Sequence, residues 1–260
     1  MRILLIDSYN MIHRSRFGWA KGEHSTTFTF FRSLRSEIER HKPNKVYIVS
    51  EGRPQHRLAI NPDYKGNREK IDDDGFHRQK DDIFNLCKHL PVTIIRHQDY
   101  ECDDVIAHLA LHVHKEHEVV ICSSDTDFIQ LLTNKNISLW NPVKKSFIKQ
   151  WPVDYLIWKS LRGDKTDNIP GIKGVGDKTA MKLAADKSLL DEYLSVGDRL
   201  SVYKSAMSQI KLGKIADNNF QQDDYNFDCK TLHEQFSSRG FKSIVEKSWR
   251  KWTMTMENVR

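Results

Sequence analysis

Nine acidic side chains, in five short clusters, are the residues of this chain best suited to chemistry. Carboxylates gathered in a protein interior cannot all stay ionised unless cations neutralise them, because burial and like-charge repulsion both disfavour the charged form. Divalent ions prefer hard oxygen ligands, so such a cluster favours a metal-dependent phosphoryl-transfer site. The nine residues are Asp7, Glu51, Glu101, Asp103, Asp104, Asp125, Asp127, Asp164 and Asp167.

Apolar runs of strand length precede four of the clusters, and segments with helical spacing lie between the runs. Uninterrupted apolar runs are typical of parallel strands that are buried on both faces. Their alternation with helices predicts an α/β sheet that carries helices on both faces. The predicted strands are residues 3–6, 46–49, 92–95 and 119–122, and the predicted helices are near 28–41, 76–90 and 103–115.

The acidic clusters occur where such a sheet forms its sites. Ligands bind outside the carboxyl ends of parallel strands, and Asp7, Glu51 and Asp125 each come at or just after the end of a predicted strand. The cluster 101–104 opens the helix after the third strand. Each acid alone could be an ordinary helix N-cap. Four such placements together predict one shared site.

The charge balance points to a polyanionic partner. The chain has 41 Lys and Arg against 35 Asp and Glu, a net charge of +6 and a pI near 9.0. Because nine of the acids fall in the clusters, the rest of the chain is much more basic. A basic surface around a small acidic site suits a nucleic-acid enzyme. A merely soluble basic protein is the alternative on charge alone.

Length and composition limit the remaining possibilities. The 260 residues can bury a substantial core, in one large domain or a domain with a smaller appendage. No apolar run approaches the roughly 20 residues of a membrane span and no signal peptide precedes the first strand, so we expect no membrane association and a cytoplasmic protein. The four cysteines lack paired spacing and are expected to be free thiols.

Residues 163–179 form a second informative segment, G-D-K-T-D-N-I-P-G-I-K-G-V-G-D-K-T, after a helical stretch at 153–161. Asp164 and Asp167 are three residues apart, so one turn of helix would put both carboxylates on one face. The glycines that follow permit a tight connection to a helix near 177–186, whose first N–H groups could approach a phosphate.

The glycine-rich connection allows three interpretations. A P-loop is disfavoured because Asp177 separates Gly176 from Lys178. A helix-turn-helix that binds the DNA backbone fits better and would place Lys173 and Lys178 near phosphates. An ordinary helical hairpin is the purely structural alternative.

The charged segment at about 53–78 has no apolar periodicity and predicts an exposed, mobile loop or arch. If Tyr64 to Arg68 is helical, Lys65 and Arg68 lie on one face and can meet a phosphate together. The ring of Tyr64 would then offer a stacking surface for a base. A solvated surface is the alternative for such a charge run.

Together these segments resemble the 5′-nuclease family, which includes flap endonucleases, the 5′–3′ exonuclease domain of bacterial DNA polymerase I and free-standing bacteriophage 5′-exonucleases. The resemblance covers about residues 1–185. Four motifs carry it: Glu101-Cys102-Asp103-Asp104 is similar to E-x-D-D, Asp125-Thr126-Asp127 to D-x-D, Tyr64-Lys65-Gly66-Asn67-Arg68 to Y-K-x-x-R, and 163–180 to the family's glycine-rich signature.

The resemblance implies an α/β fold with a PIN-like, central, mostly parallel sheet flanked by helices. It also implies a short arch and a C-terminal helical subdomain with a helix-turn-helix DNA-binding element. The nuclease core would then span residues 1–150, with the arch at about 53–78, and the helical subdomain and C-terminal helices would span 151–260. We expect residues 186–260, including Trp249 and Trp252, to have a packing role.

The resemblance also implies two Mg²⁺ or Mn²⁺ ions. The family usually has Asp where this chain has Glu51, so that ligand departs from the pattern. The implied ligands of the first ion are Asp7, Glu51, Glu101, Asp103 and Asp104, and those of the second are Asp125, Asp127, Asp164 and Asp167. A K⁺ ion would be bound by the backbone of Gly171, Ile172, Gly174, Val175 and Gly176.

The activity implied is hydrolysis of DNA phosphodiesters by in-line attack of a metal-activated water, in replication or repair. Lys65 and Arg68 would neutralise charge on the phosphate. The substrate would be DNA with free 5′ ends, flaps or junctions, and the enzyme a monomer. Two alternatives stay open: a catalytically impaired DNA-junction binding protein of this fold, and a PIN-like ribonuclease, against which the 163–179 segment argues.

Overall fold

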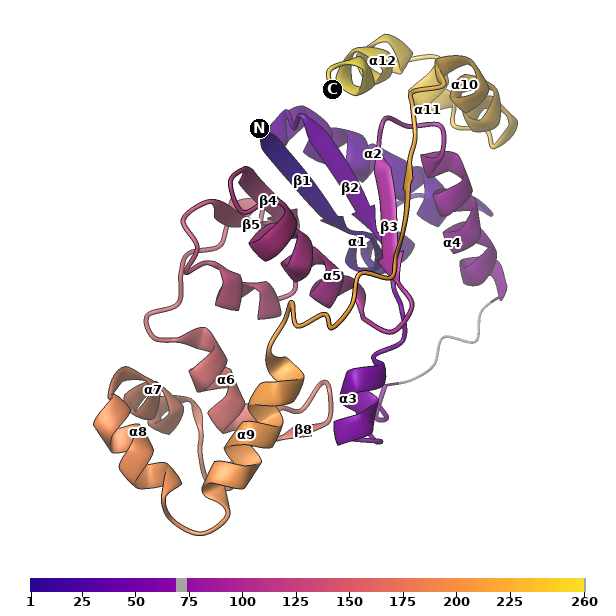
Figure 1. The fold of residues 1–260 in the computed structure, drawn as a ribbon. Coiled ribbons are helices and arrows are strands. Elements are labelled where there is room, and N and C mark those ends of the chain that lie inside the picture. Colours follow the sequence, from indigo (N-terminus) through magenta and orange to yellow (C-terminus); the bar gives the residue numbers. More distant parts are fainter. Residues whose placement is uncertain (69–73, 260) are drawn as a thin grey trace.

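The computed structural model describes residues 1–68 and 74–259 (Figure 1). In this part of the chain the central sheet has seven strands in the order β6-β5-β4-β1-β2-β3-β9. The strands from β5 to β3 are parallel, whereas β6 and β9 are antiparallel edges. The predicted mostly parallel α/β sheet is therefore confirmed. The strands are β1 Arg2–Asp7, β2 Lys45–Val49, β3 Thr93–His97, β4 Glu118–Cys122, β5 Ile137–Asn141, β6 Ser146–Phe147 and β9 Phe220–Asp224.

Burial on both faces explains the apolar runs. Along β1, Ile3 and Leu5 enter one hydrophobic core and Leu4 and Ile6 enter the other, and all four are fully buried. Each such side chain contributes about 1.5–3 kcal/mol by leaving water. The central strands are thus held by two cores, and their carboxyl ends are fixed firmly in space.

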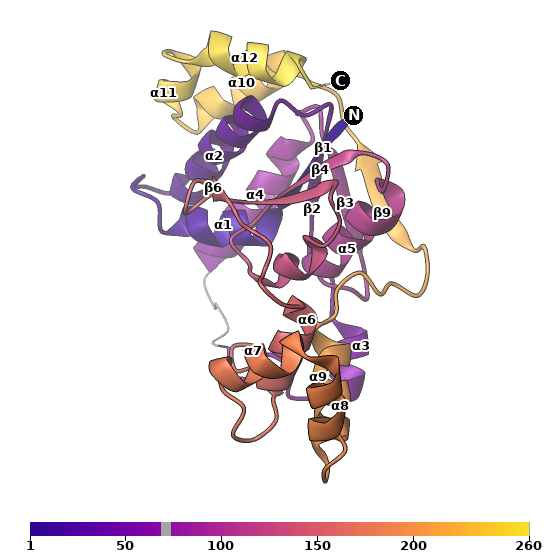
Figure 2. The same cartoon turned by 90° about the vertical axis from the view of Figure 1, so that its left-hand side faces the viewer.

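Helices cover both faces of the sheet, as predicted (Figure 2). One core contains α5 and the π-helical turn that follows it; the other contains α1, α2, α4 and the C-terminal helices. Trp252 is fully buried there against Phe31 and Phe236, which confirms its packing role. These elements are α1 Ser8–Arg16, α2 Ser25–His41, α4 Asp74–Cys87, α5 Cys102–His108, the π-helical turn Leu109–Val113, α10 Cys229–Ser238, α11 Lys242–Val245 and α12 Trp249–Glu257.

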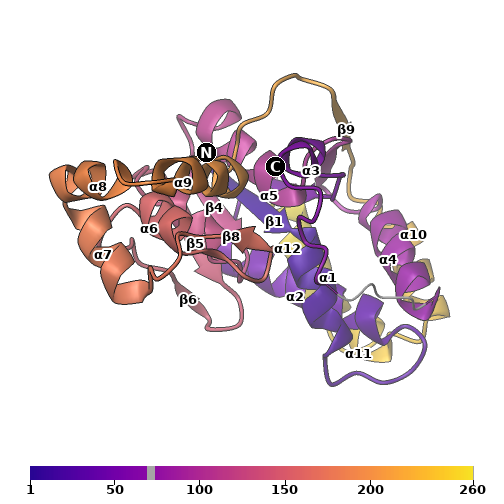
Figure 3. The same ribbon diagram turned by 90° about the horizontal axis from the view of Figure 1, so that it is seen from below.

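A separate helical layer lies beyond the carboxyl ends of the parallel strands, at the opposite end of the molecule from α10 to α12 (Figures 1 and 2). Seen from below, α7 and α8 lie to one side and α4 to the other (Figure 3). The elements of this layer are α3 Gln55–Ile60, α6 Tyr155–Arg162, β7 Gly163–Asp164, β8 Ile169–Pro170, α7 Asp177–Ala185, α8 Lys187–Leu194 and α9 Arg199–Ile210. A short 3-10 helix, Asp127–Leu131, follows β4.

The last part of the chain returns to the sheet. Strand β9 pairs with β3, and α12 packs on α2. Residues 220–259 therefore belong with the layers that hold residues 1–150, and the helical layer at the strand ends spans 155–210 together with α3. The sequence does not predict β9 because its residues, Phe-Gln-Gln-Asp-Asp, are almost all polar and exposed.

Two further features of the described residues concern membrane spans and cysteines. None of the helices in the described residues is long and apolar enough to cross a bilayer. The four cysteines are free thiols, as predicted, and three of them are buried.

Candidate active site

The end of β1 is joined to the end of β4 through Asp7. This residue caps α1 by accepting a hydrogen bond from the Asn10 N–H at 3.0 Å, and its second oxygen accepts one from Ser123 Oγ at 2.7 Å. Ser123 Oγ also accepts from the Asp125 N–H at 3.0 Å. Burial raises the pKa of Asp7 to about 6 despite these hydrogen bonds.

Glu51 is brought to the start of α5 by a close backbone approach after β2. Its Oε2 accepts a hydrogen bond from the Cys102 N–H at 3.1 Å. A Cβ at Gly52 would lie 1.9 Å from the His97 carbonyl oxygen, so only glycine fits between the ends of β2 and β3. Burial, with added repulsion from Glu101 and Asp103, raises the pKa of Glu51 to about 8.

The first turn of α5 places three carboxylates together. One oxygen from each of Glu101, Asp103 and Asp104 lies within 4.8 Å of the others. Burial is the main cause of the raised pKa values of Asp7, Glu51 and Asp125, and Asp103 adds to each of them. Asp103 is thus the electrostatic centre shared by both predicted groups of metal ligands.

Arg57 of α3 is a buried cation that the sequence interpretation missed. Its side chain is 1% exposed, ion-pairs with both oxygens of Asp104 and donates to Glu101 Oε2 at 2.7 Å. Its Nε donates to the carbonyl of Gln209 at 2.7 Å, at the end of α9. Arg57 therefore joins α3, α5 and α9 at the acidic cluster.

Many of the described residues 55–68 are exposed, as predicted for a loop or arch, but Arg57 and Tyr64 are buried. Residues 55–60 form α3, and residues 62–67 form turns rather than the helix considered for 64–68. Lys65 adopts the left-handed region at φ 55°, and its N–H donates to the Asp167 carbonyl at 2.9 Å. Residues 69–73, the middle of the predicted arch, lie outside the described residues.

The side chains of this turn point into the acidic cluster. Lys65 Nζ lies 2.5 Å from Glu101 Oε1 and 3.7 Å from Asp167 Oδ2, and Arg68 ion-pairs with Asp167. The ring of Tyr64 is buried, and its hydroxyl lies 3.0 Å from Glu101 Oε2 and 3.1 Å from Asp167 Oδ2. The prediction that the ring of Tyr64 offers a stacking surface for a base is therefore wrong, because the ring is buried.

A second unanticipated cation, Lys159, lies between two acidic clusters. Its Nζ ion-pairs with Asp127 and lies 2.7 Å from Asp164 Oδ2, and the side chain is 9% exposed. These two carboxylates raise the pKa of Lys159 against the opposing effect of burial. The signal in the sequence is a lysine that directly follows the apolar run 155–158 at the start of α6.

Asp164 and Asp167 share a tight hairpin rather than the predicted turn of helix. Strands β7 and β8 pair, and Asp164 Oδ1 accepts from the N–H groups of Thr166 at 2.8 Å and Asp167 at 3.3 Å. Gly163 has φ 69°, and a Cβ there would lie 2.3 Å from the Gly171 nitrogen. The hairpin still directs both carboxylates to the cluster, where they meet Lys159 and Lys65.

Hydrogen bonds, ion pairs and charge interactions connect all nine predicted acids at the carboxyl ends of the strands. Five of them have a cationic partner closer than 3.0 Å. Among the described residues, Asp7, Glu51 and Asp125 have none within ion-pair distance, and Asp103 has only Arg57, at 3.9 Å. Negative charge without a close counter-charge thus remains at the centre, and carboxylate oxygens of this kind suit a hard divalent cation.

The glycine-rich turn before α7 exposes its two lysines. Lys173 in the turn and Lys178 in the first turn of α7 are exposed, whereas Ile172 and Val175 are buried in the core. The turn is held by a hydrogen bond from the Ile172 N–H to the Leu161 carbonyl at 2.9 Å. Both lysines are available to a phosphate; the K⁺ site and the helix-turn-helix role remain predictions.

Comparison with known proteins gives one family. Residues 2–155 match the family described as 5′–3′ exonuclease, N-terminal resolvase-like domain. DNA polymerase I of Treponema pallidum is 33% identical over 202 residues, which is 70% of this chain and 20% of that protein. Thermostable DNA polymerase I of Thermus thermophilus is 30% identical over 215 residues, 76% of this chain and 26% of that protein. The chain thus spans about a quarter or less of the length of these relatives.

Solved structures of similar fold cover nearly the whole chain. A bacteriophage T5 flap endonuclease, in a pseudo-enzyme–product complex with DNA and metal ions, superposes with a TM-score of 0.70 at 17% identity and covers 99% of this chain and 100% of that chain. Flap endonuclease from Methanococcus jannaschii gives a TM-score of 0.62 at 14% identity, with coverage of 99% and 91%.

Proposed function

Because the chain belongs to the family of 5′–3′ exonuclease N-terminal resolvase-like domains, we propose that it is a divalent-metal-dependent nuclease that hydrolyses DNA phosphodiesters at 5′ ends, flaps or junctions. The family predicted from the sequence is thereby confirmed. The observation that carries the proposed activity is the group of four carboxylates, Asp7, Glu51, Asp103 and Asp125, without a close counter-charge at the centre of the cluster.

The donor set fits two Mg²⁺ or Mn²⁺ ions. Asp7, Glu51 and the carboxylates of α5 would hold one ion, and Asp125 with Asp127, Asp164 and Asp167 the other. All of these donors are hard carboxylate oxygens, which favours Mg²⁺ or Mn²⁺ over zinc. When bound, such ions lower the pKa of water and stabilise the attacking and leaving oxygens of an in-line displacement.

The cations of the turn at 62–68 would bind the scissile phosphate. Lys65 and Arg68 now ion-pair with Glu101 and Asp167, and only Arg68 is half-exposed. Where a metal ion would take over the charge of Glu101 and Asp167, Lys65 and Arg68 would be free to turn toward the phosphate oxygens. Lys65 would act there as a point charge and Arg68 as a planar fork.

Arg57 and Lys159 would keep their present partners throughout the reaction. Both are buried and each bridges separate elements, so they hold Asp104 and Asp164 in place rather than meet substrate. In this arrangement Asp104 would support the first ion's site as the ion-pair partner of Arg57 and would not ligate the ion directly. The central donors of the first ion are then Asp7, Glu51 and Asp103.

Duplex DNA would lie on the helical layer next to the cluster. Lys173 and Lys178 would contact phosphates at the start of α7, in a helix-turn-helix made with α6. A K⁺ ion bound by backbone carbonyls of Gly171, Ile172, Gly174, Val175 and Gly176 would complete this contact. The arch would be the segment from α3 to the start of α4.

The experiment is product analysis on a 5′-labelled flap substrate with and without Mg²⁺. Mononucleotides indicate exonuclease action and a released oligonucleotide indicates flap cleavage. Asp103→Asn should reduce cleavage by at least about 100-fold, because it removes charge from the centre of the site. The matched control is Asp191→Asn, an exposed carboxylate of α8 outside the cluster. Mg²⁺-dependent cleavage by Asp103→Asn at the control's rate would reject the assignment.

Two alternatives give other outcomes in the same assay. A catalytically impaired junction-binding protein, which the Glu at position 51 could reflect, would bind the flap substrate without cleaving it in Mg²⁺ or Mn²⁺. A PIN-like ribonuclease would cleave the matching RNA and leave the DNA intact. The retained acids argue against the first, and the glycine-rich turn before α7 argues against the second.

A further inference from the structure

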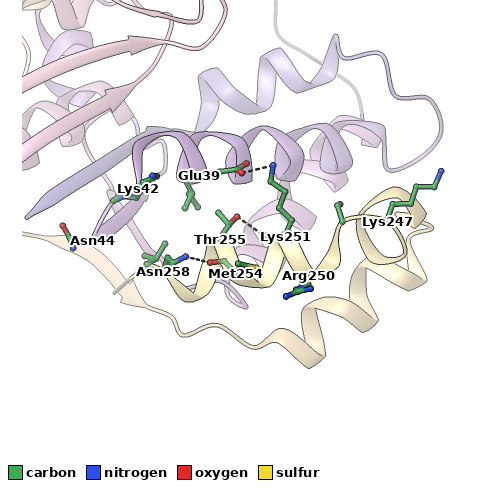
Figure 4. Close-up of a pocket in the computed structure, with 13 residues that line it drawn as sticks. Glu39, Lys42, Asn44, Lys247, Arg250, Lys251, Met254, Thr255 and Asn258 are labelled. Atoms are coloured by element: carbon green, nitrogen blue, oxygen red, sulfur yellow. Dashed lines mark hydrogen bonds and ion pairs between the residues drawn. The ribbon is translucent and has the colours of Figure 1, made fainter.

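A hollow unrelated to the acidic cluster lies between α2 and α12 (Figure 4). Its volume is about 860 Å³, and it is lined by Ile38, Glu39, Lys42, Pro43 and Asn44 on one side and by eight residues between Lys247 and Val259, without Trp249 and Trp252, on the other. We call it the α2–α12 groove. It adjoins the amino end of β2, whereas the acidic cluster lies at the carboxyl ends of the strands, so the same sheet separates the two sites.

The groove carries an excess of positive charge. Its one acidic lining residue, Glu39, is already paired with Lys251 at 2.8 Å and with Arg35 at 2.7 Å. Three further cations, Lys42, Lys247 and Arg250, have no acidic partner within ion-pair distance in the described part of the chain and are exposed. In Figure 4, Lys42 and Lys247 lie at opposite ends of the groove.

Aliphatic surface lies between these cations. Ile38 and Pro43 are buried in the wall, and Met254 is 54% exposed although it is a large apolar side chain. No aromatic ring is among the residues that line the groove, so there is no surface on which a base could stack. A recessed hollow with an apolar wall and separated cations suits carboxylates combined with an apolar side chain better than a continuous phosphate backbone.

We propose that the α2–α12 groove binds an acidic peptide segment of a protein partner. Its carboxylates would pair with Lys42, Lys247 and Arg250, and an apolar side chain would pack against Ile38 and Met254. This inference goes beyond the proposed nuclease function and does not depend on it. Because the groove and the acidic cluster lie at opposite ends of the strands, the protein can hold the peptide and DNA at the same time.

The test measures the fluorescence anisotropy of a labelled peptide, Asp-Glu-Asp-Asp-Leu-Leu, with the full chain. We expect saturable binding that weakens as salt is raised. The double variant Lys247→Glu/Arg250→Glu should weaken binding at least about tenfold, because two attractions become repulsions. Met254→Ala should weaken it by a smaller factor. The peptides Asp-Glu-Asp-Asp-Gly-Gly and Asn-Gln-Asn-Asn-Leu-Leu, which lack the apolar or the acidic half, should both bind more weakly.

The matched control is Lys135→Glu/Lys230→Glu, which reverses two exposed lysines outside the groove. Thermal unfolding midpoints of both double variants should equal that of the parent, because the changed side chains are exposed. Equal loss of binding in the control and in the groove variant would overturn the proposal. The proposal would also be overturned if the peptide showed no saturable binding, or if an equal concentration of single-stranded DNA displaced it fully. A third contrary result is concentration-dependent self-association of the chain that the groove variant abolishes.

Discussion

At the scale of single residues, two buried cations explain how so many carboxylates can share one site. Arg57 and Lys159 are charged groups that almost never enter an interior unless they are paired. Arg57 joins the acids at the start of α5 to the end of α9, and Lys159 joins Asp127 to Asp164. The protein therefore neutralises some of the carboxylates itself, whereas Asp7, Glu51 and Asp125 have no cationic partner within ion-pair distance among the described residues.

Replacing Arg57 by Met should strongly destabilise the protein in chelator. The change leaves Asp104 and Glu101 buried beside each other without their counter-charge, and breaking one side of a buried ion pair costs about 3–5 kcal/mol. Urea unfolding with EDTA measures this cost. Arg53→Met, an exposed arginine near the start of α3, is the matched control and should change stability by less than about 0.5 kcal/mol. Similar midpoints for the two variants would contradict the bridging role of Arg57.

The carboxyl of Glu51 predicts a pH dependence of stability. Its pKa is raised from 4.5 to about 8, so the folded protein binds this proton more tightly than the unfolded chain. Stability without metal should therefore fall as pH rises from about 4.5 to about 8, and Mg²⁺ should stabilise the protein more at pH 8 than at pH 6. Thermal unfolding across this pH range, in EDTA and in Mg²⁺, measures both effects. Glu51→Gln should flatten the slope, and an unchanged slope in that variant would refute the assignment.

At the scale of elements, the predictable features were those with a repeating apolar pattern. Four of the five parallel strands, β1 to β4, and the helices α2, α4, α5, α6 and α7 can be predicted because their apolar residues form runs or recur at regular spacing. Strand β9 is not predicted because it is a polar, exposed edge strand. Its pairing with β3 joins residues that are more than 100 positions apart in the sequence. The role of Arg57 is not predicted for a related reason. The neighbouring sequence does not distinguish a buried arginine in a six-residue helix from a solvated one.

The spacing of acids predicted the site better than it predicted local geometry. Asp164 and Asp167 reach the cluster through the β7–β8 hairpin instead of a helical turn, because Asp164 accepts hydrogen bonds from the two backbone N–H groups that follow it. A side chain that bonds its own backbone competes with helix formation.

The β7–β8 hairpin makes a specific prediction at Gly163. Alanine there would be forced into φ 69° and would place a Cβ 2.3 Å from the Gly171 nitrogen. The backbone conformation, φ 69° with ψ −174°, is essentially restricted to glycine and alone costs about 1–3 kcal/mol, so with the close contact added the total loss of stability should exceed about 1 kcal/mol. Denaturant unfolding of Gly163→Ala measures the loss. Gly176→Ala is the control, because a Cβ at that position meets no atom within 4 Å; equal stability of both variants would show that the close approach is unimportant.

At the scale of the whole molecule, the chain is basic in spite of its acidic site. With a net charge of +6 despite the acidic cluster, DNA binding should be dominated by phosphate contacts and should weaken steeply with salt. In chelator, so that no cleavage occurs, the slope of log affinity against log salt should decrease by about 1 for each of Lys173→Ala and Lys178→Ala. Lys230→Ala, an exposed lysine on α10 at the opposite end of the molecule, should leave the slope unchanged. Equal slopes for all three variants would exclude the start of α7 from the DNA path.

The return of the chain to the sheet at β9 limits how the helical layer can move. Helices α6 to α9 are joined to the sheet at both of their ends, through residues 148–154 and 211–219, and Arg57 ties α9 to α5 beside the second connection. Helix α3, which belongs to the same layer, is connected separately to β2, so the layer is held to the sheet by more than one linker and cannot swing as freely as a lobe on a single one. Any opening that admits DNA would therefore also move Asp164 and Asp167, which the layer carries, relative to the carboxylates at the strand ends.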